Sequence, residues 1–345
     1  MNDQEIDELL PFVLKRDNVA RYEDGKVLIG DRRKYPFEKT FYECQDVEEV
    51  ASAIEMMVTQ GGGPWVAASF GMAMAAREVD GKPEHVALPH IEKAKERLVS
   101  TRPTNTALHL ILEGLTLVAK QAISEGKSVE RAILTAIQEG RDKRYQDHMR
   151  CARYGADLIA DGDGILTMCF AETSFILALA LAVRDGKSIE VFTPETRPYL
   201  QGARLTAPSI HELGIPVTVI GDSMPTHIMS QGKIQKYLTA ADLITLDGHV
   251  VNKIGTFQNA IAAKYFGIPY FAFMWGADPN SPDRASIKIE ERDPAEMRTC
   301  RGAPTTLSEI QAYYPAFDVT PPHMVSGVIT RHGVFSPYDL KSHFV

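Results

Sequence analysis

The chain has few cysteines and no motif that groups them. Cys44, Cys151, Cys169 and Cys300 lie far apart, with no Cys-x-x-Cys pair and no tight cluster with histidine. This spacing argues against the usual zinc sites and against a disulfide framework. We therefore expect no metal site and a reducing compartment such as the cytoplasm.

Positive charge and long apolar segments are also scarce. The formal net charge is −8, so the chain lacks the basic surface that a nucleic-acid partner requires. No uninterrupted apolar run approaches the ~20 residues needed to cross a bilayer. The first residues, 1–8, are acidic and lack the basic and apolar regions of a signal peptide. These absences predict a soluble, cytoplasmic protein with no membrane or nucleic-acid partner.

Internal repeats and low-complexity tracts are absent, and so is a nucleotide-binding loop. Gly61-Gly62-Gly63-Pro64 has neither the lysine nor the hydroxyl residue of a P-loop, and no strand precedes it. We interpret it as backbone that must approach a ligand or another element closely. No other segment indicates a cofactor site, so we expect a protein that needs no cofactor.

The 345 residues are enough for two domains, and the patterning changes near the middle. Residues 19–22, 26–29 and 40–43 have the composition of short strands, with a hairpin-type turn at Asp24-Gly25. Helical spacing of apolar residues follows over 47–60, 65–77, 91–99, 106–125 and 128–155. We expect residues 1–150 to form a small β element and a helical bundle.

Short apolar runs alternate with helical stretches after residue 160. The expected strands are 164–168, 188–192, 216–220, 237–240 and 269–273, and the expected helices are 175–185, 201–213, 224–231 and 258–266. This alternation predicts an α/β domain over residues 151–345, with a parallel, doubly wound sheet. Ligands of such sheets bind beyond the carboxyl ends of the strands.

Two reactive residues stand at expected strand ends. Cys169 ends the first strand. A free cysteine is most often buried and behaves as a small apolar side chain. The alternative is a reactive thiolate, which a helix starting near Thr173 could stabilise. Asp242 follows the fourth strand and could equally be a turn or N-cap carboxylate. Asp222, after the third strand, has the same ambiguity.

The segment after Asp242 indicates an anion site. Asn252-Lys253-Ile254-Gly255-Thr256 opens a helical pattern, and a free helix start binds anions through its N–H groups and dipole. Lys253 adds a full charge. An acid/base candidate beside a phosphate-binding candidate predicts chemistry on a small phosphorylated molecule.

Arginine-containing loops offer further anion contacts, each with a structural alternative. The loop at Arg102 precedes a helix and could contact phosphate or cap that helix. In residues 195–204, Arg197 and Arg204 suit bidentate oxyanion contacts and Gln201 stands at a helix start; the alternative is a solvated turn with a salt-bridged helix start.

Taken together, these segments resemble the S-methyl-5-thioribose-1-phosphate isomerases, whose wider family includes ribose-1,5-bisphosphate isomerases and regulatory subunits of the initiation-factor nucleotide exchange complex. The resemblance runs from about residue 22 to 336. Its blocks, in order, are Asp24-Gly-Lys26, Asp31-Arg-Arg-Lys-Tyr-Pro36, Tyr42-Glu-Cys44, Arg102-Pro-Thr104, Glu195-Thr-Arg-Pro198, Leu200-Gln-Gly-Ala-Arg-Leu-Thr-Ala207, Asn252-Lys-Ile-Gly-Thr256, Ile289-Glu-Glu-Arg292 and Pro315-Ala-Phe-Asp-Val-Thr-Pro321.

The resemblance implies a small N-terminal β and helical domain, a Rossmann-like C-terminal domain and a homodimer. It implies a methionine-salvage enzyme that converts 5-methylthioribose 1-phosphate to 5-methylthioribulose 1-phosphate. It assigns catalysis to Cys169 and Asp242. The implied substrate-binding positions are Gly62, Gly63, Arg102, Gln201, Asn252 and Lys253.

The chain departs from the family pattern near the expected pocket. The family's Arg-Gly-Ala-Pro segment, whose arginine contacts substrate, is here Gly61-Gly62-Gly63-Pro64, and its Asn-Ala-Gly after the cysteine is Phe170-Ala171-Glu172. Asp247-Gly248-His249 also differs from the common isomerase sequence. Two alternatives therefore stay open: an isomerase of 5-deoxyribose 1-phosphate or ribose 1,5-bisphosphate, and a non-catalytic, sugar-phosphate-sensing regulatory subunit.

Overall fold

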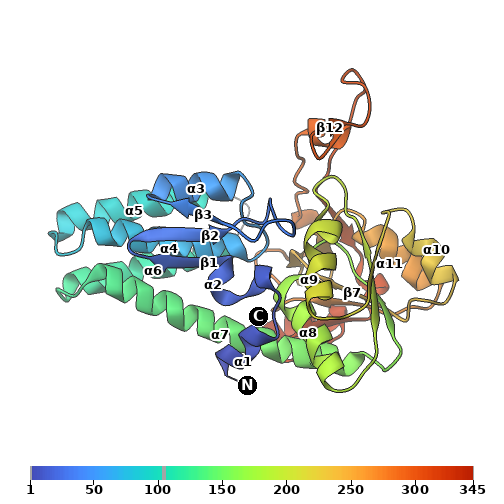
Figure 1. The fold of residues 1–345 in the computed structure, drawn as a ribbon. Helices are drawn as coiled ribbons and strands as arrows, with labels where there is room; N and C mark the ends of the chain where they lie inside the picture. Colours follow the sequence, from blue (N-terminus) through green and yellow to red (C-terminus); the bar gives the residue numbers. More distant parts are fainter. Residues whose placement is uncertain (1, 103–105, 345) are drawn as a thin grey trace. The chain divides into compact units, whose positions relative to one another are not determined.

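The computed structural model describes residues 2–102 and 106–344. The chain divides into two compact units, Met1–Gln146 and Asp147–Val345. The division falls inside α7 (Val129–Leu158), a few residues before the expected boundary. Figure 1 shows the ribbon coloured along the chain.

The N-terminal unit contains a three-stranded antiparallel sheet of β1 (Ala20–Glu23), β2 (Lys26–Gly30) and β3 (Phe41–Cys44). The turn between β1 and β2 places Asp24 at φ 51° and Gly25 at φ 83°. Two successive positive φ values suit the right-handed twist of a tight hairpin. The hairpin prediction is confirmed.

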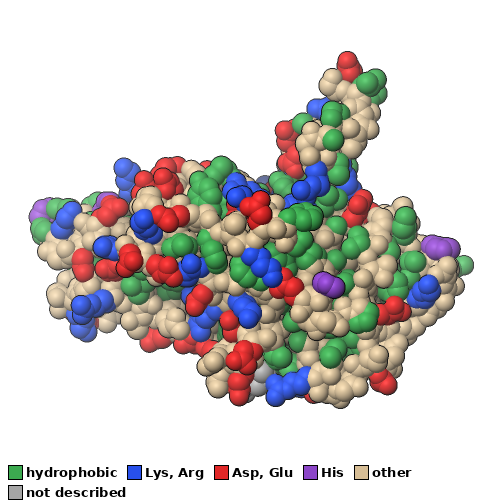
Figure 2. Space-filling view, viewed as in Figure 1, with side chains coloured by type: hydrophobic (Ala, Val, Ile, Leu, Met, Phe, Trp, Pro, Cys, Tyr) green, Lys and Arg blue, Asp and Glu red, His purple; other side chains and the backbone are tan. Residues whose placement is uncertain are grey.

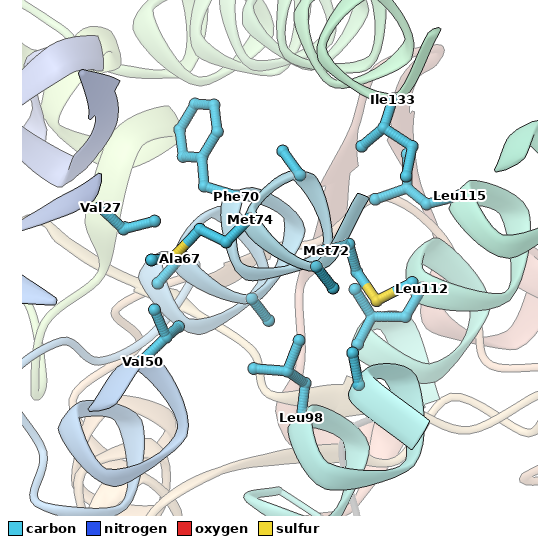
Figure 3. Close-up of a cluster of buried hydrophobic side chains, with 14 of the residues drawn as sticks. Val27, Val50, Ala67, Phe70, Met72, Met74, Leu98, Leu112, Leu115 and Ile133 are labelled. Atoms are coloured by element: carbon cyan, nitrogen blue, oxygen red, sulfur yellow. The ribbon is translucent and has the colours of Figure 1, made fainter. Parts of the chain in front are cut away.

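Helices make up most of the rest of this unit. They are α1 (Asp3–Glu8), α2 (Arg16–Val19), α3 (Val47–Glu55), α4 (Gly63–Glu78), α5 (Glu84–Ser100), α6 (Thr106–Ser124) and α7. Helix α4 is central, because every residue from Gly63 to Ala76 except Trp65 is buried. Its Gly71 meets α5 closely, since a Cβ there would lie 3.2 Å from Leu98 Cδ1. Figure 3 shows Val50, Leu98 and Leu112 around α4, so its small residues allow close helix packing.

Helix α6 is more apolar than the sequence scan indicated. In the described part of the chain, one stretch, Ala107–Ser124, is long and apolar enough to cross a membrane by length and composition alone. Glu113 and Lys120 interrupt it, which is why a search for an unbroken apolar run misses it. Leu108 and Leu112 are fully buried in the core of the N-terminal unit, as in a core helix of a globular domain.

The C-terminal unit is built on a seven-stranded sheet in the order β15-β14-β10-β7-β4-β5-β6. The strands are β4 (Gly164–Leu166), β5 (Glu190–Pro194), β6 (Val217–Ile220), β7 (Lys236–Ala240), β10 (Tyr270–Phe273), β14 (Gly327–Thr330) and β15 (Gly333–Phe335). All neighbours are parallel except β14 and β15. The five expected strands and the doubly wound class are confirmed. The sequence analysis missed β14 and β15, which are short and lie beyond the last expected strand.

Helices connect the parallel strands: α8 (Glu172–Arg184), α9 (Ala207–Glu212) after a π-helical turn at Gly202–Thr206, α10 (Pro225–Ser230) and α11 (Thr256–Tyr265). A short helix, α12 (Leu340–Phe344), follows the last strand. The strand order reverses at β4, whose neighbours are β5 and β7. This reversal opens a crevice at the carboxyl ends of β4 and β7, where ligands bind in doubly wound sheets.

A smaller antiparallel sheet, in the order β13-β9-β8, lies after β7 in the chain. It consists of β8 (Leu243–Ile244), β9 (Val250–Lys253) and β13 (Phe317–Thr320). Asn252 and Lys253 therefore end a strand, and α11 begins only at Thr256. The segment from residue 293 to 313, which carries the hairpin of β11 (Thr299–Cys300) and β12 (Ala303–Pro304), stands out from the C-terminal unit in Figures 1 and 2.

Candidate active site

Cys169 and Asp242 lie at the crevice where the strand order reverses. Cys169 comes shortly after β4 and Asp242 shortly after β7, and these two strands are hydrogen-bonded neighbours. The charge on Asp242 acts on the Cys169 thiol, so the two side chains are within electrostatic reach of each other. The sheet topology thus brings together the two residues that the sequence analysis placed at strand ends.

Strained backbone gathers at the same sheet edge. Four residues other than glycine have left-handed φ angles after β4 and β5: Cys169 at 62°, Glu172 at 54°, Thr196 at 64° and Leu200 at 61°. Such conformations cost about 1–3 kcal/mol each and cluster at active sites and ligand clamps. The strain supports this edge as a functional site independently of any residue's chemistry.

Cys169 is held by its backbone and is present as a thiol. Its N–H donates to Thr196 Oγ1 at 3.3 Å, and the Thr206 hydroxyl donates to its carbonyl oxygen. Burial raises the pKa of the thiol to about 11, although the charge of Lys253 opposes the shift. Of the two states that the sequence left open, the raised pKa favours the neutral thiol, because the start of α8 does not offset the loss of water around the sulfur.

Asp242 keeps solvent access but is surrounded by enough protein to lose much of its hydration. This desolvation raises its pKa to about 6; Lys253 opposes the rise and Glu172 adds to it. Within the described residues its carboxylate accepts no hydrogen bond, so it caps neither a helix nor a turn. A carboxyl with a pKa close to neutrality can both donate and accept a proton.

Lys253 is a buried cation beside this pair. Only 4% of the residue is exposed, and its Nζ lies 4.6 Å from the centre of the Phe317 ring. Among the described residues its ammonium group forms no ion pair or hydrogen bond, although its charge acts on both Cys169 and Asp242. Asn252 is equally buried, and its amide donates to Thr256 Oγ1 at 3.0 Å. A buried ammonium without a paired anion is costly, which points to an anionic ligand.

The start of α11 is not a free anion site, contrary to the sequence analysis. The N–H groups of Gly255 and Phe257 donate to the Asp318 carboxylate at 2.7 and 3.1 Å. Asp318 therefore occupies the donors that a phosphate would have used. The anion-binding prediction for this segment now depends on Lys253 rather than on the helix dipole.

Two ambiguous residues, Gln201 after β5 and Asp222 after β6, have different roles. Asp222 accepts the N–H groups of Thr196 and Arg197 at 2.7 and 2.8 Å, so it is a turn carboxylate. Gln201 is 6% exposed, and its Oε1 has no hydrogen-bond partner among the described residues. A buried amide oxygen left without a donor fits the substrate-binding position that the resemblance gave it.

The other expected substrate-binding residues belong to the N-terminal unit. Arg102 Nη2 donates to the Ile54 carbonyl at 2.8 Å; Pro103 and Thr104 of the same motif lie outside the described residues. Gly62 precedes α4 and Gly63 begins it. A Cβ on Gly63 would lie 1.8 Å from Thr59 Oγ1, so this backbone packs tightly against the turn that precedes it. The substrate contacts of Gly62, Gly63 and Arg102 stay predictions.

Two further charged residues act on the pair: Glu172, which the sequence placed near the expected pocket, and Arg292, which was not expected at the site. Glu172 and Arg292 both act electrostatically on Asp242, and Arg292 also acts on Cys169. The available signals were the position of Glu172 three residues after Cys169 and the Ile289-Glu-Glu-Arg292 block of the resemblance. Among residues 2–102 and 106–344, no three His, Cys, Asp or Glu side chains are grouped to hold a metal ion.

Comparison with known proteins identifies the family. The profile of the Initiation factor 2 subunit family matches residues 64–337. The chain belongs to this family. It is 38% identical over 328 residues to a methylthioribose-1-phosphate isomerase of Syntrophotalea carbinolica, with 91% of this chain and 94% of that protein covered.

Solved structures of the same family agree. A 5-methylthioribose 1-phosphate isomerase from Pyrococcus horikoshii is 31% identical, with a TM-score of 0.87 over 99% of this chain and 96% of that one. The translation initiation factor eIF-2B delta subunit from A. fulgidus is 32% identical, with a TM-score of 0.81 over 93% and 96%. The recognition made from the sequence is confirmed.

Proposed function

We propose that this chain is an aldose–ketose isomerase that converts 5-methylthioribose 1-phosphate to 5-methylthioribulose 1-phosphate in methionine salvage. The observation that carries the proposal is the pairing of Cys169 with Asp242 at the strand-order reversal, beside the buried cation Lys253. Relatives of the chain that bear the name of this isomerase, at 38% and 31% identity over most of its length, support the substrate.

The chemistry of the substrate explains why two proton-handling groups are needed. The anomeric oxygen of an aldose 1-phosphate is blocked by the phosphate, so the ring cannot open by loss of a hemiacetal proton. The ring oxygen must be protonated, and hydrogen must then move from C2 to C1. Asp242 serves the ring oxygen and hydroxyl protons, because its pKa of about 6 lets it change protonation state near neutral pH.

Cys169 serves the carbon atoms and enters the reaction as a neutral thiol. In one route the Asp242 carboxylate, formed when Asp242 protonates the ring oxygen, accepts the thiol proton, and the Cys169 thiolate removes the C2 proton to give an enol phosphate. The thiol then returns this proton to C1, and the C2 hydroxyl gives up its own proton to restore the thiol. In the other route, hydride shifts directly from C2 to C1 and Cys169 shapes the site. Deuterium from D2O appearing at C1 identifies the shuttle. Full retention of a label placed on C2 identifies the hydride shift.

Mutation of the pair tests the assignment. Cys169→Ala and Asp242→Asn should each lower kcat by roughly 10²–10⁴-fold, the usual contribution of a positioned acid or base. Cys300→Ala, which changes a free cysteine of the β11–β12 hairpin, is the matched control. Near-normal turnover by either site variant would remove that residue from the mechanism.

A related sugar 1-phosphate is the second candidate substrate. Gly61 replaces the family arginine, and Phe170 and Glu172 stand where the family has asparagine and glycine. These changes favour 5-deoxyribose 1-phosphate or ribose 1,5-bisphosphate as alternatives. Kinetics on all three sugars, with coupled ketose detection, decide among them: the preferred substrate is the one with the highest kcat/KM.

A regulatory role without catalysis is the alternative from another class, since an initiation factor subunit shares the fold. The presence of both Cys169 and Asp242 argues against it. Isomerisation by the purified protein, lost on mutation of either residue, would exclude it.

The remaining expectations extend the proposal. A cytoplasmic location is consistent with four free cysteines, and a homodimer is the assembly implied by the resemblance. The reaction oxidises C2 and reduces C1 of the same molecule, so it needs no redox cofactor, and the sequence leads us to expect no metal site. Light scattering tests the dimer, and activity after extensive EDTA treatment tests metal independence.

A further inference from the structure

Arg292 and Tyr314 stand at the two ends of the projecting segment from residue 293 to 313 (Figure 1). Their backbones pair: Arg292 N–H donates to the Tyr314 carbonyl at 2.9 Å, and Glu291 bridges Pro315 in antiparallel fashion. Residues directly opposite on an antiparallel pair point to the same side. The base of the projecting segment therefore presents these two side chains together.

The same ribbon continues to Lys253. Ala316 N–H donates to Glu290 O at 2.8 Å, Ile254 N–H donates to Ala316 O at 3.1 Å, and Phe317 lies opposite Lys253 in the β13–β9 pair. This ladder joins Arg292 and Tyr314 to the strand of Lys253, and both residues are within electrostatic reach of Cys169.

The guanidinium of Arg292 is held in place by one hydrogen bond, and its two terminal nitrogens have no partner among the described residues. Its Nε donates to Glu290 Oε1 at 2.8 Å, and its central carbon lies 5.5 Å from the centre of the Tyr199 ring. Among the described residues, neither Nη1 nor Nη2 has a hydrogen-bond partner. These two nitrogens form the end-on fork that binds two oxygen atoms at once.

The hydroxyl of Tyr314 is also without a partner. The residue is 2% exposed, and no described group bonds to its Oη. Burial keeps the phenol protonated by raising its pKa, so it offers one O–H donor. A buried hydroxyl left unpaired costs about 1–3 kcal/mol, a cost that a ligand acceptor removes.

We propose that Arg292 and Tyr314 form a donor subsite for oxygen atoms of the bound sugar phosphate, next to Cys169. The subsite rests on the proposed function, which supplies the ligand. Three donors, two from Arg292 and one from Tyr314, match acceptor oxygens of either the phosphate or the sugar hydroxyls. Glu290 balances the charge of Arg292 and holds its fork in place.

The test uses the full chain with Tyr314→Phe and Arg292→Lys. Tyr313→Phe is the control for the first, because its hydroxyl is exposed and bonds to Glu291. Arg284→Lys, at an exposed arginine, is the control for the second. The measurements are kcat and KM for the sugar that the wild type prefers, its Kd by calorimetry, Ki for inorganic phosphate, and Tm to check folding.

Each site variant should lower kcat/KM or raise Kd by about 10-fold or more, while the controls stay near the wild-type values. A matching rise in Ki for inorganic phosphate assigns the donors to the phosphate group; an unchanged Ki assigns them to sugar hydroxyls. Values for both folded site variants close to those of their controls overturn the subsite. If the wild type turns over no sugar in the panel, the proposed function fails, and Kd for those sugars still tests the subsite.

Discussion

The N–H of Gly255 donates to the carboxylate of Asp318 at 2.7 Å, so the first turn of α11 already holds an anion that belongs to the protein. Phe257 donates to the same carboxylate at 3.1 Å. The pairing joins β13 to the start of α11 and fixes the chain that follows Lys253. Asp318 is therefore a structural residue that positions the buried lysine.

Removing this carboxylate should destabilise the fold more than neutralising it. Asp318→Ala leaves two helix-start N–H groups without an acceptor and should lower the free energy of unfolding by about 1–3 kcal/mol. Asp318→Asn keeps an oxygen acceptor and should cost less. Urea unfolding compares them; equal losses in both variants would contradict the capping role.

Lys253 should act on both substrate affinity and the pKa of Asp242. Lys253→Met removes a buried cation, so KM for the sugar phosphate should rise by about 10-fold or more. The bend near pH 6 in the kcat/KM profile should move to higher pH, because Lys253 lowers the pKa of Asp242 against the effect of burial. Lys264→Met, at an exposed position near the end of α11, should change neither value.

Glu172 should shift the same bend in the opposite direction. Burial is the main cause of the raised pKa of Asp242, and the negative charge of Glu172 adds to it. Glu172→Gln removes that charge at nearly constant size, so the bend should move below about pH 6. The phosphate of the substrate titrates identically with both enzymes, so the difference between the two profiles isolates Asp242. An unmoved bend would show that Glu172 does not tune this carboxyl.

The left-handed backbone conformation of Glu172 should lower the free energy of unfolding. Its φ of 54° is unfavourable for any residue with a Cβ but not for glycine, which is the family's residue here. Glu172→Gly should therefore be more stable than Glu172→Gln by about 1 kcal/mol. Both variants lack the charge, so their difference in unfolding free energy reports the backbone alone. A glycine variant no more stable than the glutamine variant would refute stored strain.

Most of the fold and the centre of the site could be predicted from the sequence. The strands β4 and β7 show as apolar runs, and the parallel topology follows from their alternation with helices, so Cys169 and Asp242 could be placed at one sheet edge. Asn252 and Lys253 were predicted as a helix start because Thr256 onward has helical spacing. Pairing with β13, more than 60 residues later, makes them a strand instead.

The electrostatics could not be predicted, because they depend on which residues surround a group. The sequence left both a thiol and a helix-stabilised thiolate open for Cys169, and the fold raises its pKa by desolvation, which favours the thiol. Arg292 and Tyr314 are 22 positions apart, and only the backbone pairing at the base of the projecting segment brings them together. Long-range pairing of this kind leaves no local pattern in the sequence.

The ionised carboxylate of Asp242 should lower the free energy of unfolding at neutral pH. Its pKa is about 6 in the folded chain against an ordinary value of 3.8, mainly because of burial. The folded state therefore holds a proton that the unfolded state has lost between these values, and stability from this group falls as pH rises through about 6. Asp242→Asn cannot ionise, so it should have a higher Tm than the wild type above pH 6, with the difference vanishing below about pH 4.

Asp247→Asn is the control with the opposite sign. Although burial raises the pKa of Asp247, hydrogen bonds from Thr245 and His249 lower it overall. The variant should therefore be less stable than the wild type at neutral pH, and this difference should shrink in acid. Thermal unfolding of the three proteins from about pH 2 to pH 8 measures both trends, because the pKa of Asp247 lies below 3.8. A Tm difference for Asp242→Asn that does not change with pH would contradict the raised pKa.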